Sequence, residues 1–261
     1  MMETRSGRVE FDHVRKEFAV GKGQRYTAIT DLHFTVEPGE IVAIVGQTGA
    51  GKSTALSLLL GLSEPTSGAV RIDGRSPYRD FEYFRGRIGI IFQTDRLMPW
   101  RTTLENAVYG LELLGKSRAD REAAAMRWLS RLGLADFAHA WPYQLSGGMR
   151  QRVSIARTFA LNPDILVADE AFAHLDELTA RDLRRDLLSL VEETGKTTIF
   201  VTHSVDEAIA LGHRILVFAR PGRVVDTLRV TSSPSDAERA ALREQVLAAL
   251  SAARQPVGAA P

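Results

Sequence analysis

The sequence contains no cysteine among its 261 residues. A disulfide framework, a thiolate zinc site, an iron–sulfur cluster and a cysteine nucleophile are therefore excluded. An excess of charge of one sign is also lacking, because 33 Lys and Arg oppose 32 Asp and Glu for a net charge of +1. This balance argues against a strongly basic nucleic-acid-binding protein, although a local basic patch is still compatible with it.

Long hydrophobic runs are lacking too. The longest wholly aliphatic run is Ile41–Val45, and Leu56–Leu62 is interrupted by a serine and a glycine. Both are far shorter than the roughly 20 apolar residues that span a bilayer. Residues 1–8 also lack the apolar stretch of a secretory signal. We therefore expect a cytosolic chain that does not cross a membrane by itself, with a flexible tail of small residues at Gln255–Pro261.

The composition that is present, 44% hydrophobic and 25% charged, is typical of a globular protein with one large or two modest domains. Apolar and polar residues alternate at Val9–Val14 and Leu32–Val36, which predicts an antiparallel sheet with one solvated face. Ile41–Val45 is apolar on both faces, as is typical of a buried parallel strand. Similar buried strands are expected at Ile165–Ala168, Thr197–Val201 and Ile215–Phe218.

Helical patterns separate these strands, notably Ala180–Glu193, and this alternation predicts an α/β core. Between about residues 94 and 145 only helices are expected, at Leu104–Leu114 and Arg118–Leu132, and a last helix is expected at Ser235–Ala253. We interpret the chain as a core of residues 8–93 and 146–232 with a helical subdomain of residues 94–145 inserted into it. Residues 233–261 are expected to form a C-terminal helix and a flexible tail.

A glycine-rich loop follows the strand Ile41–Val45 directly and opens a helix. It reads Gly46, Gln47, Thr48, Gly49, Ala50, Gly51, Lys52, Ser53, and Thr54 follows it. The first eight residues fit the phosphate-loop pattern G-x-x-x-x-G-K-[ST], in which backbone N–H groups and the helix dipole cradle phosphate oxygens. Lys52 would reach the β- and γ-phosphates, and the Ser53 hydroxyl would bind Mg²⁺. The alternative is a plain glycine-rich turn, but the strand and helix on either side favour a nucleotide site.

Two carboxylates, Asp169 and Glu170, end the apolar strand Ile165–Ala168. They are expected at the C-terminal edge of a parallel sheet, where ligands bind in open α/β folds. Asp169 suits a contact to Mg²⁺, and Glu170 suits a general base that polarises water toward the γ-phosphate. Alone, this segment could equally be a solvated strand end, but together with the phosphate loop it indicates a nucleotide site.

A second helix N-terminus follows at Leu145–Arg152, where Ser146 suits an N-cap and Gly147 and Gly148 expose backbone N–H groups. With this segment the sequence resembles the ATP-binding-cassette (ABC) ATPases, whose Walker A, Q-loop, signature, Walker B and H-loop motifs all occur here over roughly residues 9–230. The resemblance implies a P-loop NTPase core with an N-terminal antiparallel β subdomain and an inserted α-helical subdomain. It also implies an ATPase with ATP and Mg²⁺ as cofactors.

The resemblance assigns roles to single residues. Gln93, after an expected strand Ile88–Phe92, matches the Q-loop glutamine that contacts Mg²⁺ and the attacking water; otherwise it would be an ordinary loop residue. His203 matches the H-loop histidine that hydrogen-bonds the γ-phosphate; otherwise it would be structural. Phe18, or else Tyr26, matches the aromatic residue that stacks on adenine, with a core phenylalanine as the alternative. The implied catalytic residues are Glu170, His203, Lys52 and Gln93, and the implied metal ligands are Ser53, Gln93 and Asp169.

Two cassettes of such ATPases pair head to tail, so the resemblance implies a homodimer. Ser146, Gly147 and Gly148 of one chain would close over the ATP that Lys52 and Ser53 of the other chain hold. Turnover per chain should then rise with protein concentration.

The sequence departs from the family pattern after Glu170. Ala171 stands where a proline is common, and His174 replaces a small residue beside the dimer interface, whereas Leu175 and Asp176 are retained. We expect hydrolysis to persist, and we hypothesise that His174 makes closure of the dimer mildly pH-sensitive.

The segment Gln93–Trp100 resembles the Q-loop region of importers for nitrate, sulfonates, taurine and related solutes, in which L-x-P-W follows the glutamine. Leu97, Met98 and Trp100 would offer an apolar groove to a coupling helix of a membrane permease; packing inside the helical subdomain is the alternative. The implied protein is the ATPase subunit of an importer, bound to the inner face of the membrane through the permease. A periplasmic or surface solute-binding protein would be an indirect partner, and no nucleic-acid partner is expected.

Two other functions stay open at this point. One is a soluble ABC-type ATPase module that acts on nucleic acid, although such proteins typically carry coiled-coil, zinc or tandem-cassette insertions that are not found here. The other is a regulator that no longer hydrolyses ATP, against which Glu170 and His203 argue.

Overall fold

The computed structural model describes residues 7–21, 23–231 and 234–253. The described residues up to Glu82 and from Ile199 form one compact unit, and Tyr83–Thr198 form a second one. The tail predicted at Gln255–Pro261 lies outside the described residues.

The first unit is built on a mixed β-sheet with the strand order β4-β1-β2-β9-β8-β3. β1 pairs antiparallel with β2 and β4, β2 pairs parallel with β9, and β8 pairs antiparallel with β9 and parallel with β3. The strands are β1 (Val9–Ala19), β2 (Arg25–Val36), β3 (Ile41–Gly46), β4 (Ser67–Ile72), β8 (Arg214–Ala219) and β9 (Gly222–Arg229). The predicted antiparallel sheet and the predicted buried strand Ile41–Val45 are thereby confirmed.

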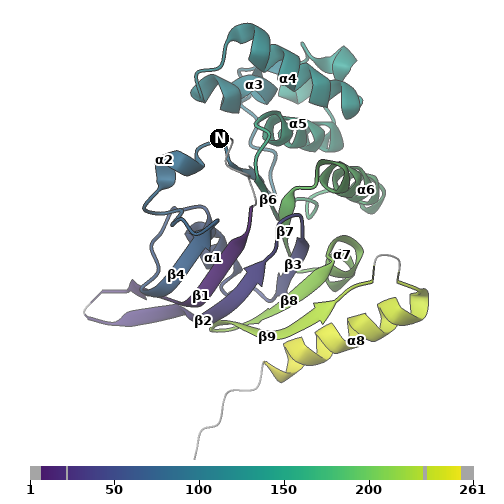
Figure 1. Ribbon diagram of the computed structural model, residues 1–261. Coiled ribbons are helices and arrows are strands. Elements are labelled where there is room, and N and C mark those ends of the chain that lie inside the picture. The colour runs from purple at the N-terminus through teal and green to yellow at the C-terminus, as the bar shows by residue number, and fades with distance from the viewer. Residues whose placement is uncertain (1–6, 22, 232–233, 254–261) are drawn as a thin grey trace, which may run out of the picture. The chain divides into compact units, whose positions relative to one another are not determined.

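Helices flank this sheet, and an aromatic cluster fills its core. The helices are α1 (Lys52–Leu59), α2 (Phe81–Phe84, at the boundary with the second unit), α7 (Val205–Leu211) and α8 (Asp236–Ala252). Helix α7 packs on β3, and α8, the C-terminal helix expected from the sequence, packs on α7, β8 and β9 (Figure 1). The buried ring of Phe34 lies 4.6 Å from that of Phe11 and 6.1 Å from that of Phe218, centroid to centroid. These contacts join β1 and β2 to β8.

The second unit contains a parallel strand pair and a helical cluster. Strand β5 (Ile88–Ile91) pairs parallel with β6 (Ile165–Asp169). Its helices are α3 (Thr103–Leu113), α4 (Arg118–Arg131), α5 (Gly147–Ala160) and α6 (Glu177–Thr194), with short 3₁₀ turns η1 (Ala135–Phe137) and η2 (Pro142–Gln144). Helices α3, α4 and α5 pack against one another, and the buried rings of Trp128 and Phe159 lie 4.9 Å apart (Figure 1). Strand β7 (Thr197–Thr202) spans the boundary between the two units in the sequence.

The predicted α/β fold is confirmed, and both helices expected between residues 94 and 145 are present as α3 and α4, with no strand in that stretch. The division into a core and an inserted subdomain stays a prediction. Strands β4 and β9, helices α2 and α7 and the two 3₁₀ turns were not predicted. Strand β4 is short and begins Ser-Gly, β9 mixes Arg, Asp and Thr with its apolar residues, and α7 has fewer than three turns. Within the described ranges, no helix combines the length and the apolar character that a bilayer crossing requires.

Candidate functional site

The predicted phosphate loop joins β3 to α1 in the first unit. Strand β3 is buried along its whole length, and α1 begins at Lys52. The residue before α1, Gly51, has a φ of 85°, a conformation that side chains disfavour. A Cβ atom there would also lie 3.1 Å from the carbonyl oxygen of Ala28 and from the Cα atom of Gly222. The glycine therefore lets the loop turn tightly against β2 and β9.

The N-terminus of α1 has no side-chain cap. The first N–H groups of a helix have no partner within the helix and carry the positive end of its dipole, so they attract anions. Gln47, Thr48, Gly49 and Ser53 are exposed around this end. The geometry is that of a phosphate-binding helix N-terminus, and nucleotide binding by these residues stays a prediction.

Lys52 is held inside the loop. Only 8% of the residue is exposed, and its ammonium group donates hydrogen bonds to the carbonyl oxygens of Gly46 and Gln47. A lysine so buried needs hydrogen-bond partners, and the loop backbone supplies them. The positive charge is thereby fixed at the loop that is expected to receive phosphates.

The predicted H-loop residue His203 is exposed and follows β7. The Thr202 hydroxyl before it donates to the carboxylate of Glu207 at 2.6 Å and accepts a hydrogen bond from the backbone N–H of Ser204. The Ser204 hydroxyl in turn caps α7 by accepting from the backbone N–H of Glu207. These contacts fix the turn that carries His203.

The two aromatic candidates for adenine stacking lie directly opposite each other. Phe18 of β1 pairs with Tyr26 of β2, and each is 41% exposed. The alternative that Phe18 is a core residue is therefore wrong. The Lys16 ammonium lies 5.0 Å from the centroid of the Phe18 ring, which is a cation–π distance.

In the second unit, the two predicted carboxylates stand at the end of β6. Asp169 is the last residue of the strand, and Glu170 has a φ of 48°. That left-handed conformation costs a non-glycine residue about 1–2 kcal/mol, and such strain tends to occur at functional sites. The turn at Glu170 ends the alternation of the strand, so the two consecutive carboxylates need not lie on opposite faces of the sheet.

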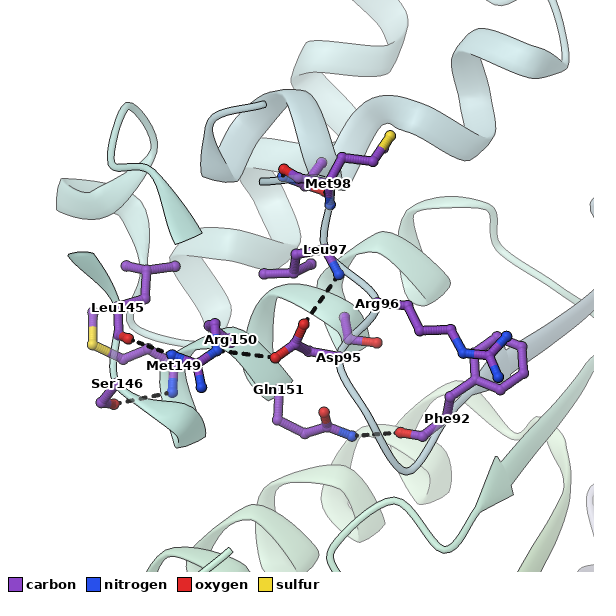
Figure 2. Close-up of polar contacts among 12 residues, drawn as sticks. Phe92, Asp95, Arg96, Leu97, Met98, Leu145, Ser146, Met149, Arg150 and Gln151 are labelled. Atoms are coloured by element: carbon purple, nitrogen blue, oxygen red, sulfur yellow. Dashed lines mark hydrogen bonds and ion pairs between the residues drawn. The ribbon is translucent and has the colours of Figure 1, made fainter. Parts of the chain in front are cut away.

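Gln151 of α5 ties the predicted Q-loop to the segment after Glu170. Its buried side-chain amide donates hydrogen bonds to the carbonyl oxygen of Phe92 at 3.0 Å and to that of Ala171 at 2.9 Å (Figure 2 shows the first). The residue before Gln93 and the residue after Glu170 are thus fastened to the same side chain. Sequence reasoning missed Gln151, although it stands within the recognised signature segment.

Asp95 extends this network. Its carboxylate accepts from the backbone N–H of Leu97 and from the guanidinium of Arg150, each at 3.0 Å (Figure 2). Arg157 donates to the carbonyl oxygens of Asp95 and Arg96, and burial lowers the pKa of its guanidinium despite the nearby carboxylate. The helix that begins with the signature therefore holds the Q-loop segment, residues 92–98, through side chains.

The signature glycines follow a true N-cap. The Ser146 hydroxyl accepts a hydrogen bond from the backbone N–H of Met149 at 3.3 Å, which confirms the predicted cap of α5. Asp176 caps α6 in the same way through the N–H of Thr179, and this bond holds the pKa of its carboxyl below the usual range. A Cβ atom on Gly148 would lie 2.6 Å from the Thr179 side chain, so α5 begins in close contact with α6.

His174, the residue that departs from the family pattern, lies beside the Q-loop glutamine of its own chain. The Gln93 side-chain amide donates to Nε2 of His174 at 3.4 Å. Because the amide nitrogen can only donate, Nε2 of His174 is the acceptor in this contact. The sequence placed His174 only beside a dimer interface, and nothing in its pattern predicted this contact.

Trp100 is 71% exposed, so the alternative that it packs inside the helical cluster is wrong. It lines a hollow on this unit, together with Arg101, Leu104, Val108, Arg121, His139 and others. The other two residues of the predicted groove, Leu97 and Met98, are half-buried and do not line this hollow. The loop that carries it is organised by Asn106, a fully buried residue of α3. The Asn106 amide donates to the carbonyl oxygens of Met98, Arg101 and Thr102 and accepts from the Met98 N–H. Sequence reasoning did not predict a role for Asn106. Its position among the apolar residues of α3 was the signal that could have indicated one.

The predicted ligands of Mg²⁺ are the Ser53 hydroxyl, the Asp169 carboxylate and the Gln93 amide oxygen. All three are hard oxygen donors, which is the donor class that Mg²⁺ prefers. The residues therefore fit the ion by their chemistry. Ser53 stands at the start of α1, Asp169 ends β6, and Gln93 follows the end of β5 by two residues.

Comparisons with known proteins point in one direction. The sequence pattern of the ABC transporter family matches residues 29–173. The chain is 38% identical over 258 residues to the taurine import ATP-binding protein TauB of Rhizobium johnstonii, covering 93% of this chain and 96% of that protein. It is 43% identical over 216 residues to the glycine betaine transport ATP-binding protein OpuAA of Bacillus subtilis, covering 81% of this chain and 51% of that protein. Among solved structures, the dimeric post-hydrolysis state of the ATP-binding cassette MJ0796 with ADP and Pi is similar with a TM-score of 0.75 and 35% identity, over 86% of this chain and 100% of that one.

Proposed function

Since this chain belongs to the ABC transporter family and is an ATP-hydrolysing subunit of an importer, we propose that the imported solute is a small sulfonate of the taurine class. Two observations support this solute. The similarity to a taurine import protein extends over nearly the full length of both chains. The other is the L-x-P-W element at Leu97–Trp100, by which the sequence resembles importers of such solutes.

The ATPase chemistry is proposed to follow from residues at the start of α1 and at or after the ends of β5, β6 and β7. Lys52 and the N–H groups at the start of α1 bind the phosphates, with Ser53, Asp169 and Gln93 on Mg²⁺. When bound, Mg²⁺ neutralises charge on the phosphates. Glu170 takes the proton of the attacking water, and His203 hydrogen-bonds the γ-phosphate. The observation that carries this proposal is the phosphate loop at the uncapped N-terminus of α1.

The partners are proposed to be a second copy of the chain and a membrane permease, with a solute-binding protein as an indirect partner. The hollow lined by Trp100 supports a permease contact, because a 71% exposed tryptophan on a loop that Asn106 holds by hydrogen bonds suits a short amphipathic helix. The chain would then lie on the cytoplasmic face of the membrane and be attached through the permease. Phe18 or Tyr26 would stack on the adenine of the bound ATP.

Uptake by cells of the source organism tests the solute. Deletion of the gene should abolish uptake of labelled taurine, and the wild-type gene should restore it, whereas Glu170→Gln should not. Uptake of labelled glycine betaine and nitrate should be unchanged. Loss of betaine uptake with normal taurine uptake would contradict the proposed solute and leave the ATPase assignment intact.

Substitution of Trp100 by alanine tests the permease contact. Trp100→Ala should weaken co-purification of the chain with its permease. ATP affinity should be unchanged, because the Trp100 side chain is largely exposed and its removal should not disturb the fold. Tyr143→Ala is the matched control, since Tyr143 is 79% exposed and does not line the hollow. Equal assembly of the Trp100 variant and the wild type would refute this docking site.

A further inference from the structure

The pairing of β1 with β2 is irregular at three successive places, and the first of them is a β-bulge on β1. Phe11 pairs with Phe34 and Val14 pairs with Leu32, so Asp12 and His13 of β1 both lie opposite the single residue His33 of β2. A bulge of this kind places two consecutive side chains on the same face of a sheet. The buried side chains of Phe11 and Val14 both lie on the inner face of the sheet. The side chains of Asp12 and His13 lie on the outer face, as does that of His33.

The bulge has a structural basis in the sequence. His13 has a φ of 47°, which a non-glycine residue rarely adopts. On the neighbouring strand, Gly68 allows this conformation, because a Cβ atom there would lie 2.1 Å from the His13 carbonyl oxygen. On β2, Asp31 lies two residues before His33, so the ordinary alternation of a strand places it on the same outer face.

The outer face thus gathers two imidazoles and two carboxylates. The rings of His13 and His33 are stacked with centroids 4.3 Å apart. One ligand atom each of Asp12, His13 and His33 lies within 4.8 Å of the others. Asp12 Oδ1 and His33 Nδ1 are 3.9 Å apart, close to the separation of about 3.4 Å between two ligands of a tetrahedral zinc ion. The side chains of His13 and His33 are 68% and 60% exposed. Small rotations of these side chains can therefore bring their nitrogen atoms to the separation that a zinc ion requires.

The hydrogen bonds around the rings prepare them for a metal ion. Asp31 can only accept, so Nδ1 of His13 donates to it at 3.2 Å. With Nδ1 engaged by Asp31, Nε2 is the ring nitrogen of His13 that is left for a metal ion, and a carboxylate behind a metal-binding imidazole is the usual supporting contact. Arg71 holds the other oxygen of Asp12 at 3.2 Å, which fixes that carboxylate in place. Glu10, Asp12 and Asp31 bring three negative charges against the one positive charge of Arg71.

We propose that Asp12, His13 and His33 form a binding site for a divalent transition-metal ion of the zinc class, with Asp31 as the residue that orients His13. Two imidazole nitrogens and one carboxylate oxygen suit zinc, copper(II) or nickel(II), whereas Mg²⁺ and Ca²⁺ prefer oxygen ligands alone. The bound ion would link β1 to β2 across the bulge. These strands also carry Phe18 and Tyr26, so the ion would stiffen the hairpin that holds the aromatic pair.

Calorimetric titration of the tag-free full chain with Zn²⁺, without nucleotide and near neutral pH, tests the site. We expect one high-affinity equivalent per chain. His33→Ala should lower the affinity at least tenfold, and Asp31→Asn about tenfold although it leaves all three ligands in place. All these side chains are largely exposed, so the variants should fold, which circular dichroism verifies.

Two controls make the test specific. His139→Ala should bind Zn²⁺ like the wild type, because His139 is an exposed histidine outside the cluster. Excess Mg²⁺ should not displace the zinc, which separates this site from the oxygen ligands proposed for the nucleotide site. Undiminished zinc affinity of His33→Ala, equal damage by His139→Ala, or displacement by Mg²⁺ would each overturn the proposal.

Discussion

Helices α1 and α5 both begin at glycine-containing motifs that the sequence marks as anion sites, but they begin in different ways. Gly51 precedes α1 in a left-handed conformation, and no side chain caps the helix. Ser146 precedes α5 in an extended conformation, and its hydroxyl accepts the hydrogen bond of the Met149 N–H. The start of α1 has no side-chain cap and is suited to bind a ligand, whereas the start of α5 is stabilised by a side chain of the same protein.

This difference suggests a division of labour. An uncapped helix start gains a partner for its N–H groups when a phosphate arrives, so binding energy is available there. A capped start has already satisfied part of that need, so it contributes less to binding. We therefore expect α1 to determine ATP affinity, and α5 to affect mainly the step after binding.

Glu170→Gln is expected to have the largest effect. Loss of a general base should lower ATP turnover by about 100- to 10,000-fold and leave ATP affinity unchanged. Steady-state phosphate release and equilibrium ATP binding measure the two quantities. Glu192→Gln, the same change at an exposed position of α6, should retain full turnover. If Glu170→Gln hydrolysed ATP at the wild-type rate, another residue would have to be the base.

Lys52→Ala should weaken ATP binding about 10- to 100-fold, because it removes a charge-assisted hydrogen bond to the phosphates. The matched control is Lys196→Ala. Lys196 is 7% exposed and, like Lys52, donates to a backbone carbonyl oxygen, in this case that of Pro163. The control variant should lose stability but not ATP affinity. Comparable loss of affinity in both would show that burial of a lysine, not its place at α1, matters.

Ser146→Ala should leave ATP affinity unchanged and lower turnover about tenfold, the equivalent of about 1.4 kcal/mol. It should also destabilise the chain by about 1 kcal/mol, because α5 loses its N-cap. Ser235→Ala removes the corresponding cap of α8, whose hydroxyl accepts from the Glu238 N–H. Urea denaturation should show similar losses for both variants, with full turnover only for the Ser235 variant. A drop in ATP affinity of the Ser146 variant would remove the contrast between the two helices.

Asp176→Ala probes a charged cap and should have the smallest effect. The pKa of Asp176 lies below its usual value of 3.8 because the backbone N–H of Thr179 and then its hydroxyl donate to the carboxylate. The stabilisation is therefore complete above pH 3.8 and is lost as the pH falls through the lowered value. The difference in melting temperature between wild type and variant should stay constant down to about pH 3.8 and then shrink as the pH falls further. A difference that grew on acidification would contradict this sign.

How much of this arrangement could be predicted depends on how far along the chain each feature reaches. The phosphate loop and the Ser146 cap are local patterns, and the sequence predicted both. The contact between Gln93 and His174 joins residues 81 positions apart, and Gln151 reaches Phe92 across 59 positions. No local pattern encodes such pairs. The bulge at His13 was missed for another reason, since it breaks the strict alternation by which strands are recognised.

Mixing Lys52→Ala with Ser146→Ala at equal concentration tests the central claim most directly. If α1 of one chain holds the ATP over which α5 of its partner closes, a mixed dimer contains one site with both helix starts intact. The mixture should then hydrolyse ATP faster than the average of the two variants alone, and the gain should increase with protein concentration. A rate equal to that average at every concentration would contradict the account, because each chain would then act with its own two helix starts.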